Sequence, residues 1–234
     1  MKDCLKPGDC SNHCCQNKPS LFEKLSEEEF NTLFADRKTI LFKAGEIISK
    51  QGTSLTHLAC ISKGLVKTYH QRAQGSDILI NVLGPGKISG CGFMGLYHDN
   101  IHHLTMQSLT DVHLCLIPIQ PLVSVLKTNA LMANEIVKLN SGCMIKLYNK
   151  VANLTYKNMI GRVSDVLLFL RNDIYKSDEF EMHLSRQDLA DLAALTKESF
   201  IRTFKELRDT GIIEIRRNHI KIFNPSMLEE LSNK

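Results

Sequence analysis

Four of the eight cysteines fall within the first fifteen residues, and this cluster is the part of the sequence best suited to metal or redox chemistry. Thiolates bind metal ions and oxidise reversibly, whereas a disulfide framework is unusual in a reducing cytosol. The remaining four cysteines are scattered, which is typical of small buried apolar residues. The clustered cysteines are Cys4, Cys10, Cys14 and Cys15, and the scattered ones are Cys60, Cys91, Cys115 and Cys143.

A second set of chemically capable residues lies on a helix predicted to begin at Lys197. Phe200, Phe204 and Leu207 recur at steps of four and three, so they share one face and leave the other face polar. Glu198 and Arg202 lie together on the polar face. Arginine can donate two hydrogen bonds to O6 and N7 of guanine, and glutamate can accept one from the cytosine amino group. A surface ion pair between the two residues is the alternative, and it is compatible with DNA reading.

This helix is the second of a predicted pair. Ser185 followed by Asp188 forms a capping-box pattern that opens a first helix, which runs to about Ala193. A short turn leads to Thr196, a suitable N-cap for the second helix. The segments 212–217 and 219–223 then alternate apolar and polar residues across a tight turn and predict a β-wing. The pattern predicts a winged helix-turn-helix.

The charge around this motif is locally basic, although the whole chain carries a formal charge of only +4. Residues 197–221 contain seven basic and four acidic side chains. Such an excess is placed to contact phosphates and to make binding dependent on salt. The residues expected to contact DNA are Ser185, Gln187, Lys197, Glu198, Ser199, Ile201, Arg202, Lys205, Arg216 and Arg217.

Length and composition exclude several classes of protein. The 234 residues are 43% hydrophobic and 23% charged, which is typical of soluble globular proteins and not of disordered or collagen-like chains. The longest apolar run, 166–170, is far short of the roughly 20 residues that cross a bilayer. No apolar stretch of a signal peptide follows Met1, so we expect a cytoplasmic protein without a membrane partner. We find no phosphate loop, nucleophile elbow or zinc-protease motif, and we expect no enzymatic activity.

The residues between 39 and 118 predict an antiparallel β-roll. Short apolar segments at 58–62, 65–69, 78–83 and 112–117 alternate with closely spaced glycines, which is typical of short strands and turns. A short helix from Leu25 precedes the roll, because Ser26 and Glu29 form a capping-box pattern.

A long amphipathic helix is predicted from Ala130 to about Lys157. Its apolar stripe is narrow enough to be the seam between two helices, and nearly eight turns exceed what a small roll can cover. The alternative is a helix packed on its own β-roll. The stripe consists of Met132, Ile136, Leu139, Cys143, Leu147, Val151 and Leu154.

The sequence therefore predicts an α+β protein of four parts. They are an N-terminal cysteine-rich arm (1–24), a β-roll sensor domain (25–128), a dimerisation helix (129–157) and a winged helix-turn-helix domain (158–234).

In this order and spacing, several segments make the chain resemble the Crp/Fnr family of bacterial transcription regulators. The matching segments are 42–48 (Phe-Lys-Ala-Gly-Glu-Ile-Ile), 61–69 (Ile-Ser-Lys-Gly-Leu-Val-Lys-Thr-Tyr), 83–90 (Leu-Gly-Pro-Gly-Lys-Ile-Ser-Gly), 184–190 and 195–202. The resemblance implies a β-roll of the cyclic-nucleotide-binding type and a homodimer that binds a palindromic promoter site in double-stranded DNA. It also implies RNA polymerase as a partner.

The resemblance further bears on the signal. Family members that bind cyclic AMP use a glutamate and an arginine after the Gly-Pro-Gly turn, but residues 84–110 contain neither, so we do not expect a cyclic nucleotide. The Fnr-like branch instead ligates a 4Fe-4S cluster through N-terminal cysteines and one distant cysteine, which Cys115 matches in context. Three of Cys4, Cys10, Cys14 and Cys15 would complete that set, although the spacing Cys-x5-Cys-x3-Cys-Cys departs from the compact pattern of that branch.

Other interpretations of the signal stay open. The cysteines could form a zinc site or a thiol redox switch between Cys14 and a neighbour, or bind nothing. Haem is a further alternative, because His98, His102 and His103 are expected to lie in one loop and could supply an axial ligand. The DNA site also departs from the family pattern. Fnr-like members carry serine before the recognition arginine, whereas this chain has Ile201, which suits a thymine methyl group better.

Overall fold

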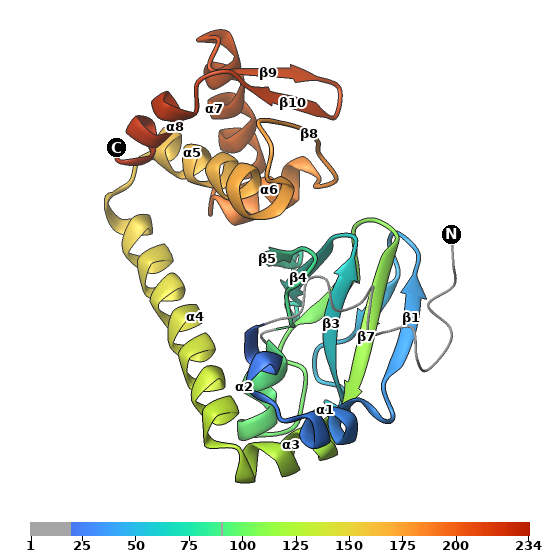
Figure 1. The fold of residues 1–234 in the computed structure, drawn as a ribbon. Helices are drawn as coiled ribbons and strands as arrows, with labels where there is room; N and C mark the ends of the chain where they lie inside the picture. Colours follow the sequence, from blue (N-terminus) through green and yellow to red (C-terminus); the bar gives the residue numbers. More distant parts are fainter. Residues whose placement is uncertain (1–19, 90) are drawn as a thin grey trace. The chain divides into compact units, whose positions relative to one another are not determined.

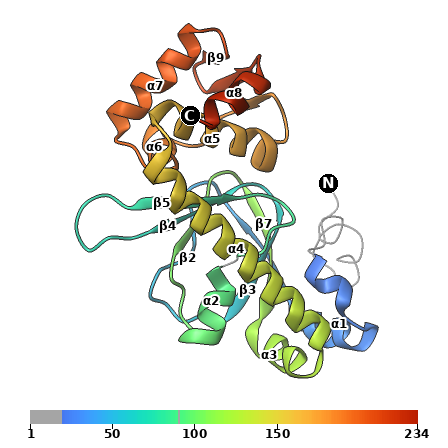
Figure 2. The same cartoon turned by 90° about the vertical axis from the view of Figure 1, so that its left-hand side faces the viewer.

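The computed structural model describes residues 20–89 and 91–234. The four clustered cysteines, Cys4, Cys10, Cys14 and Cys15, lie outside the described residues. Figure 1 labels the elements of the fold, and Figure 2 shows them from a second direction. The N-terminal elements are η2 (Ser20–Lys24), α1 (Glu27–Phe34), β1 (Lys38–Phe42), β2 (Ile47–Ser49), β3 (His57–Lys63), β4 (Val66–His70), β5 (Ile78–Leu83), α2 (Cys91–His98), β6 (Thr105–Ser108), β7 (Val112–Pro118) and α3 (Ile119–Thr128).

The long helix α4 (Ala130–Tyr156) follows, and the boundary between two compact units falls inside it, between Ile145 and Lys146. The C-terminal elements are α5 (Met159–Phe169), the π-helical turn η3 (Leu170–Tyr175), β8 (Glu179–Glu181), α6 (Arg186–Leu192), α7 (Lys197–Asp209), β9 (Ile213–Arg216), β10 (His219–Ile222) and α8 (Pro225–Ser232). Within the described residues, none of these helices combines the length and apolar character needed to cross a membrane.

Two antiparallel sheets form the N-terminal β-roll, in the strand orders β1-β7-β3 and β2-β6-β4-β5. Strand side chains alternate between two buried clusters, because successive residues of a strand point to opposite faces. Ala59 and Ile61 of β3 belong to one cluster, together with Val66 of β4 and Met106 of β6. The two sheets therefore pack face to face through this cluster.

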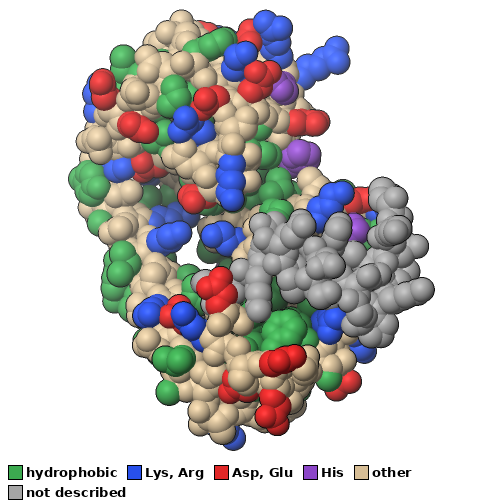
Figure 3. All heavy atoms as spheres, in the orientation of Figure 1, with side chains coloured by type: hydrophobic (Ala, Val, Ile, Leu, Met, Phe, Trp, Pro, Cys, Tyr) green, Lys and Arg blue, Asp and Glu red, His purple; other side chains and the backbone are tan. Residues whose placement is uncertain are grey.

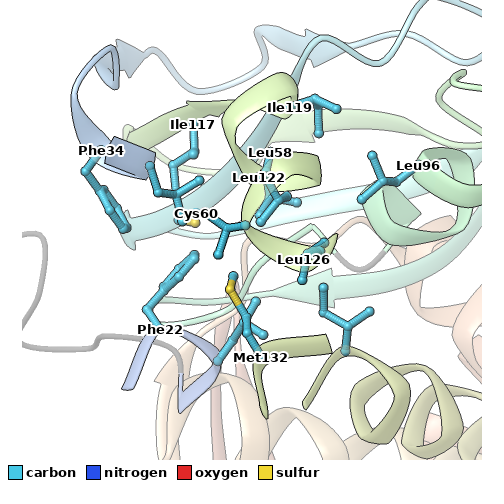
Figure 4. Close-up of a cluster of buried hydrophobic side chains, with 14 of the residues drawn as sticks. Phe22, Phe34, Leu58, Cys60, Leu96, Ile117, Ile119, Leu122, Leu126 and Met132 are labelled. Atoms are coloured by element: carbon cyan, nitrogen blue, oxygen red, sulfur yellow. The ribbon is translucent and has the colours of Figure 1, made fainter. Parts of the chain in front are cut away.

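The other face of β3 and β7 is covered by helices. Leu58 and Cys60 of β3 lie in a second cluster, and so do Cys115 and Ile117 of β7. Its other members come from helical segments on both sides of the roll in the sequence, including Leu21, Phe22, Leu33, Phe34, Leu122, Leu126, Met132 and Ile136. Figure 4 shows Phe22, Phe34, Cys60 and Met132 pointing into this cluster from four different elements.

The start of α1 follows from the capping box that the sequence predicts. The Glu29 backbone N–H donates to Ser26 Oγ at 3.2 Å, and the Ser26 backbone N–H donates to Glu29 Oε2 at 2.8 Å. Asn129 Nδ2, just before α4, also donates to Glu29 Oε2 at 2.8 Å. These hydrogen bonds lower the pKa of Glu29, that from the Ser26 backbone most strongly. Glu29 thereby ties α1 to the start of α4.

The first turns of α4 correct one sequence expectation. Met132 and Ile136, which were predicted to face a partner helix, are 0% and 3% exposed and pack into the helix-covered cluster of the same chain. A side chain that is already buried in its own domain cannot contribute to a second interface. For these two residues the alternative of a helix packed on its own β-roll is correct.

Several elements were not predicted from the sequence. Helix α3 precedes the predicted long helix and α8 follows the wing, and no helix was predicted at either place. No strand was predicted at Glu179–Glu181 either, where β8 pairs with β10. The three-stranded sheet β8-β10-β9 therefore extends the predicted hairpin by one strand.

We predict that Gly64→Ala destabilises the β-roll far more than Gly45→Ala. Both glycines have φ near +88°, where an L side chain is strained, but a Cβ at Gly64 would overlap the Asp111 carbonyl oxygen whereas a Cβ at Gly45 would contact nothing within 4 Å. Strain alone should lower the free energy of unfolding by about 1 kcal/mol at Gly45, and strain plus overlap by about 3 kcal/mol at Gly64. Urea unfolding of the two variants measures the difference, and equal losses would contradict the predicted overlap.

Candidate nucleic-acid interface

The helix pair α6 and α7 is set by its caps and by the turn between the helices. The Asp188 backbone N–H donates to Ser185 Oγ at 3.1 Å, and the Ser185 backbone N–H donates to Asp188 Oδ2 at 2.9 Å. At α7 the Ser199 backbone N–H donates to Thr196 Oγ1 at 3.2 Å. Ala194 in the turn has a φ of 51°, a left-handed conformation that reverses the chain between the two helices. These contacts fix where α7 begins.

The inner face of α7 holds the helix in place. Phe200, Phe204 and Leu207 are buried, and the rings of Phe200 and Phe204 lie 5.3 Å apart. The Arg186 guanidinium of α6 lies 4.8 Å from the centre of the Phe204 ring, a cation–π distance. Its partial burial lowers the pKa of Arg186. This contact, which no sequence pattern indicated, positions α6 against α7.

The outer face of α7 presents the residues that were predicted to read DNA. Lys197, Glu198, Arg202 and Lys205 are all exposed, and Ile201 is 43% exposed. Among the described residues, Glu198 and Arg202 have no ion-pair partner, either in each other or elsewhere, so the surface-pair alternative is not formed in this structure. Both side chains are therefore available to a ligand.

Two of the predicted contact residues are engaged within the domain. Gln187 Nε2 donates to Asp191 Oδ1 at 2.8 Å along α6, and Ser199 Oγ accepts from Thr196 Oγ1 at 3.1 Å. Both side chains are half-buried, whereas Ser185 is exposed at the start of α6. Gln187 would have to break or share its hydrogen bond to reach a base.

The wing carries a second group of basic residues. Arg216 pairs with His219 across the β9–β10 turn, and Arg217 in that turn has a φ of 55°. Arg216 Nη2 lies 2.7 Å from Glu214 Oε1, whereas Arg217 is exposed and has no ion-pair partner among the described residues. In Figure 3 the Lys and Arg side chains at the upper right lie over the tip of this hairpin. At the neighbouring strand, a hydrogen bond from Lys221 Nζ at 3.0 Å lowers the pKa of Glu179.

Beyond its buried start, α4 exposes a broad apolar face. The predicted seam residues Leu139, Cys143, Leu147, Val151 and Leu154 are all exposed, Leu147 by 60%. Three further apolar residues that sequence analysis missed lie beside them: Val137, Met144 and Tyr148. Together with Val151 they recur at steps of seven, four and three, which places them on one face of a helix. This exposed set, from Val137 to Leu154, is called the α4 apolar face below.

The distant cysteine Cys115 lies within the N-terminal unit. Cys115 and Cys60 are opposite one another in β7 and β3, and both are buried in the helix-covered cluster. Leu21 and Phe22, near the start of the described chain, belong to the same cluster. Within residues 20–89 and 91–234, no group of three or more His, Cys, Asp or Glu side chains could hold a metal ion. An iron-sulfur cluster bound at Cys115 would thus need further ligands from the cysteine-rich arm (1–24).

The three histidines proposed as alternative haem ligands do not lie in one loop, because His98 is the last residue of α2. His103 Nε2 lies 3.1 Å from Asp99 Oδ1, and the His98 ring is 6.1 Å from the His103 ring. His102 is half-buried and lines a cavity of about 100 Å³ together with Ser49, His57 and Ser89. Burial lowers the pKa of His102. The cavity is smaller than the roughly 300–1,000 Å³ of typical small-molecule pockets.

Two family profiles match the chain, one over the β-roll and one over the winged helix. The profile described as a Crp-like helix-turn-helix domain matches residues 161–231, and the cyclic nucleotide-binding domain profile matches residues 39–129. Together they cover the winged helix and most of the β-roll.

Curated relatives extend over nearly the full chain at low identity. The fumarate nitrate reduction regulatory protein of Klebsiella oxytoca is 23% identical over 98% of this chain and 94% of its own length. The electron transport regulator A of Shewanella oneidensis is 26% identical over 80% of this chain and 76% of its own. The fumarate and nitrate reduction regulatory protein of Escherichia coli K12 is 24% identical over 97% of this chain and 93% of its own length.

Solved structures share the fold. FixK2 from Bradyrhizobium japonicum matches with a TM-score of 0.75 at 19% identity, over 83% of this chain and 96% of that one. A transcriptional regulator from Eubacterium rectale matches with a TM-score of 0.75 at 20% identity, over 94% of this chain and 100% of that one. The relatives named as regulators agree with the expectation that this chain is not an enzyme.

Proposed function

From the finding that the chain belongs to the Crp/Fnr family of transcription regulators, we propose that it is a homodimer that acts in the cytoplasm. Each protomer would read one half of a palindromic DNA site with α7. One observation carries the proposal. The inner face of α7 is buried in its own domain, while Glu198 and Arg202 lie on the exposed outer face and have no ion-pair partner within residues 20–89 and 91–234. Their exposed side chains are suited to base contacts in the major groove.

The α4 apolar face supports a dimer as the binding species. Its members span Val137 to Leu154, and Tyr148, Leu147 and Val137 are each at least 60% exposed. A contiguous apolar stripe of this kind on a long helix is favourable only when a second surface covers it. A second copy of the same helix would cover it through a two-fold axis, as in most homodimers. Two recognition helices would then contact half-sites about one helical turn apart.

The outer face of α7 also indicates which bases are read. Arg202 suits a guanine, Glu198 a cytosine amino group, and the exposed side chain of Ile201 a thymine methyl group. Lys197, Lys205 and Arg217 supply charge for phosphates and carry no sequence information. We therefore expect a half-site that contains a G·C pair with a neighbouring A·T pair.

Selection from a random DNA pool tests this function. The purified full chain is mixed with random duplexes at moderate salt, and bound DNA is recovered and sequenced over several rounds. We expect a palindrome whose half-sites are centred about 10 base pairs apart, each with a fixed G·C pair. Recovery of no enriched motif, or of a single unpaired half-site, would overturn the proposal.

For the signal, we propose that the arm and Cys115 hold a 4Fe-4S cluster that responds to oxygen or nitric oxide. Cys115 lies in the same buried cluster as Leu21, and Cys15 is six residues before Leu21 in the sequence. Six residues of extended chain span at most about 20 Å, so Cys15 is close enough in the sequence to Leu21 to reach Cys115. Thiolates are the ligands that such clusters use, and a bound cluster would supply an oxidation-sensitive centre.

Replacing Cys115 with serine is predicted to remove the cluster from protein purified without oxygen. The wild-type chain should carry about four iron and four sulfide per protomer, and the variant less than about one of each, because one thiolate ligand is lost. Iron and sulfide analysis, with a visible absorption spectrum, measures the difference. Cys60→Ser is the matched control, since Cys60 lies opposite Cys115 on the neighbouring strand and in the same hydrophobic core. Full iron content in the Cys115 variant would refute this role.

A further inference from the structure

An ion pair with a buried lysine spans the bend between α4 and α5. Lys157 Nζ lies 2.9 Å from Asp165 Oδ1 and 2.8 Å from Oδ2, so both carboxylate oxygens accept from one ammonium group. The Lys157 side chain is only 8% exposed and that of Asp165 is 31% exposed. Asn153 Nδ2, in the last turns of α4, donates to the same Oδ2 at 3.3 Å. These three residues are called the elbow clamp below.

The bend is held from a second side by the end of the chain. The Asn158 backbone N–H donates to the Lys234 carbonyl oxygen at 3.1 Å, and Asn158 Oδ1 accepts from the Gly161 N–H at 2.9 Å. Gly161 lies so close to the end of α8 that a Cβ there would come within 3.2 Å of the Leu231 carbonyl oxygen. Contacts on both sides of the bend therefore join the last turns of α4 to α5 within the C-terminal unit.

The clamp differs from the ion pair formed within α4 itself. Lys138 pairs with Glu135 at 2.8 Å, but the Lys138 side chain is 63% exposed, and exposed pairs of this kind contribute little. A lysine that is nearly removed from water needs its counter-ion, and a bidentate carboxylate permits few alternative geometries. The clamp is thus suited to select one conformation of the elbow.

We propose that Lys157 and Asp165 are positioning residues that set the separation of the two recognition helices in the dimer. The last turns of α4, from Lys146 onward, belong to the same compact unit as α5 and α7. They also carry Leu147, Val151 and Leu154 of the α4 apolar face. Through the clamp, the surface that would pair two protomers is rigidly joined to the domain that would read DNA. This inference rests on the proposed dimeric function.

Half-site spacing is the readout that separates positioning from a merely structural role. The affinity of Lys157→Met is measured for the selected palindrome and for the same palindrome with its half-sites moved apart by two base pairs, which rotates them by about 70°. The wild-type chain should prefer the selected spacing by about 100-fold, and the variant by less than about tenfold. Affinity for a duplex with a single half-site should not change, because α7 is untouched.

Lys138→Met is the matched control, since it makes the same substitution in a more exposed ion pair within α4 and should keep the wild-type spacing preference. Should Lys157→Met fail to fold, Asn153→Ala weakens the clamp without leaving a buried charge unpaired and should relax the preference by a smaller factor. A folded, dimeric clamp variant that keeps the 100-fold preference would overturn the proposal. A wild-type chain that selects no palindrome would instead overturn the proposed function, and the dimeric premise of the clamp with it.

Discussion

Replacing Arg202 with alanine is expected to lower the affinity for the selected palindrome by at least about 30-fold while leaving non-specific DNA binding within about threefold. A bidentate contact to guanine contributes about 1–3 kcal/mol of discrimination, and a homodimer would lose two of them, one in each half-site. The Arg202 side chain is exposed and unpaired in the described structure, so its loss should not destabilise the fold. Fluorescence anisotropy with the palindrome and with a scrambled duplex measures both affinities.

Lys205→Ala is the matched control for this variant. Lys205 lies on the same helix and is also exposed, but we assign it to phosphate contact. Its loss should weaken binding to both duplexes by similar factors and reduce the slope of log affinity against log salt, because fewer counterions are released. If Arg202→Ala also weakened both duplexes alike, the assignment of Arg202 to base reading would be wrong.

Introducing a charge into the α4 apolar face should have the second large effect. Leu147→Glu is expected to convert the protein from a dimer of about 53 kDa to a monomer of 26.4 kDa at micromolar concentration. The dimer would have to bury two carboxylates without partners, which costs several kcal/mol and raises the dimer dissociation constant by more than about 100-fold. Sedimentation velocity measures the mass, and affinity for the palindrome should fall in parallel.

Asn149→Glu provides the control because it introduces the same charge on the same exposed stretch of α4, about 160° around the helix from Leu147. It should remain a dimer with wild-type affinity for DNA. A Leu147 variant that sedimented with the same mass as the wild-type chain would show that the α4 apolar face is not the dimer interface.

Local signals in the sequence were sufficient for the winged helix. Ser185 and Thr196 cap α6 and α7 through hydrogen bonds to residues three positions later in the chain. The two wing strands are joined by a two-residue turn. Hydrophobic periodicity placed Phe200, Phe204 and Leu207 inside. Each of these features depends on residues close together in the chain, so local sequence patterns are sufficient to predict it.

The missed features depend on partners far apart in the sequence. Periodicity could not separate Met132 and Ile136, which the β-roll covers, from the rest of the α4 stripe, because both parts have the same spacing. The β-roll covers only the first turns, so the exposed face further along also includes Met144 and Tyr148. Strand β8 was missed because its pairing with β10 joins residues about 40 positions apart. The Arg186 contact and the elbow clamp likewise need tertiary structure.

The number of chains bound to one palindromic duplex tests the central claim most directly, because that claim is that two recognition helices in one dimer read two half-sites. Native mass spectrometry of the full chain with the selected duplex should show two chains per duplex, and no single-chain complex when protein is limiting. A duplex with one half-site destroyed should bind at least about 100-fold more weakly. A single chain bound per duplex, with equal affinity for the one-half-site duplex, would contradict the account.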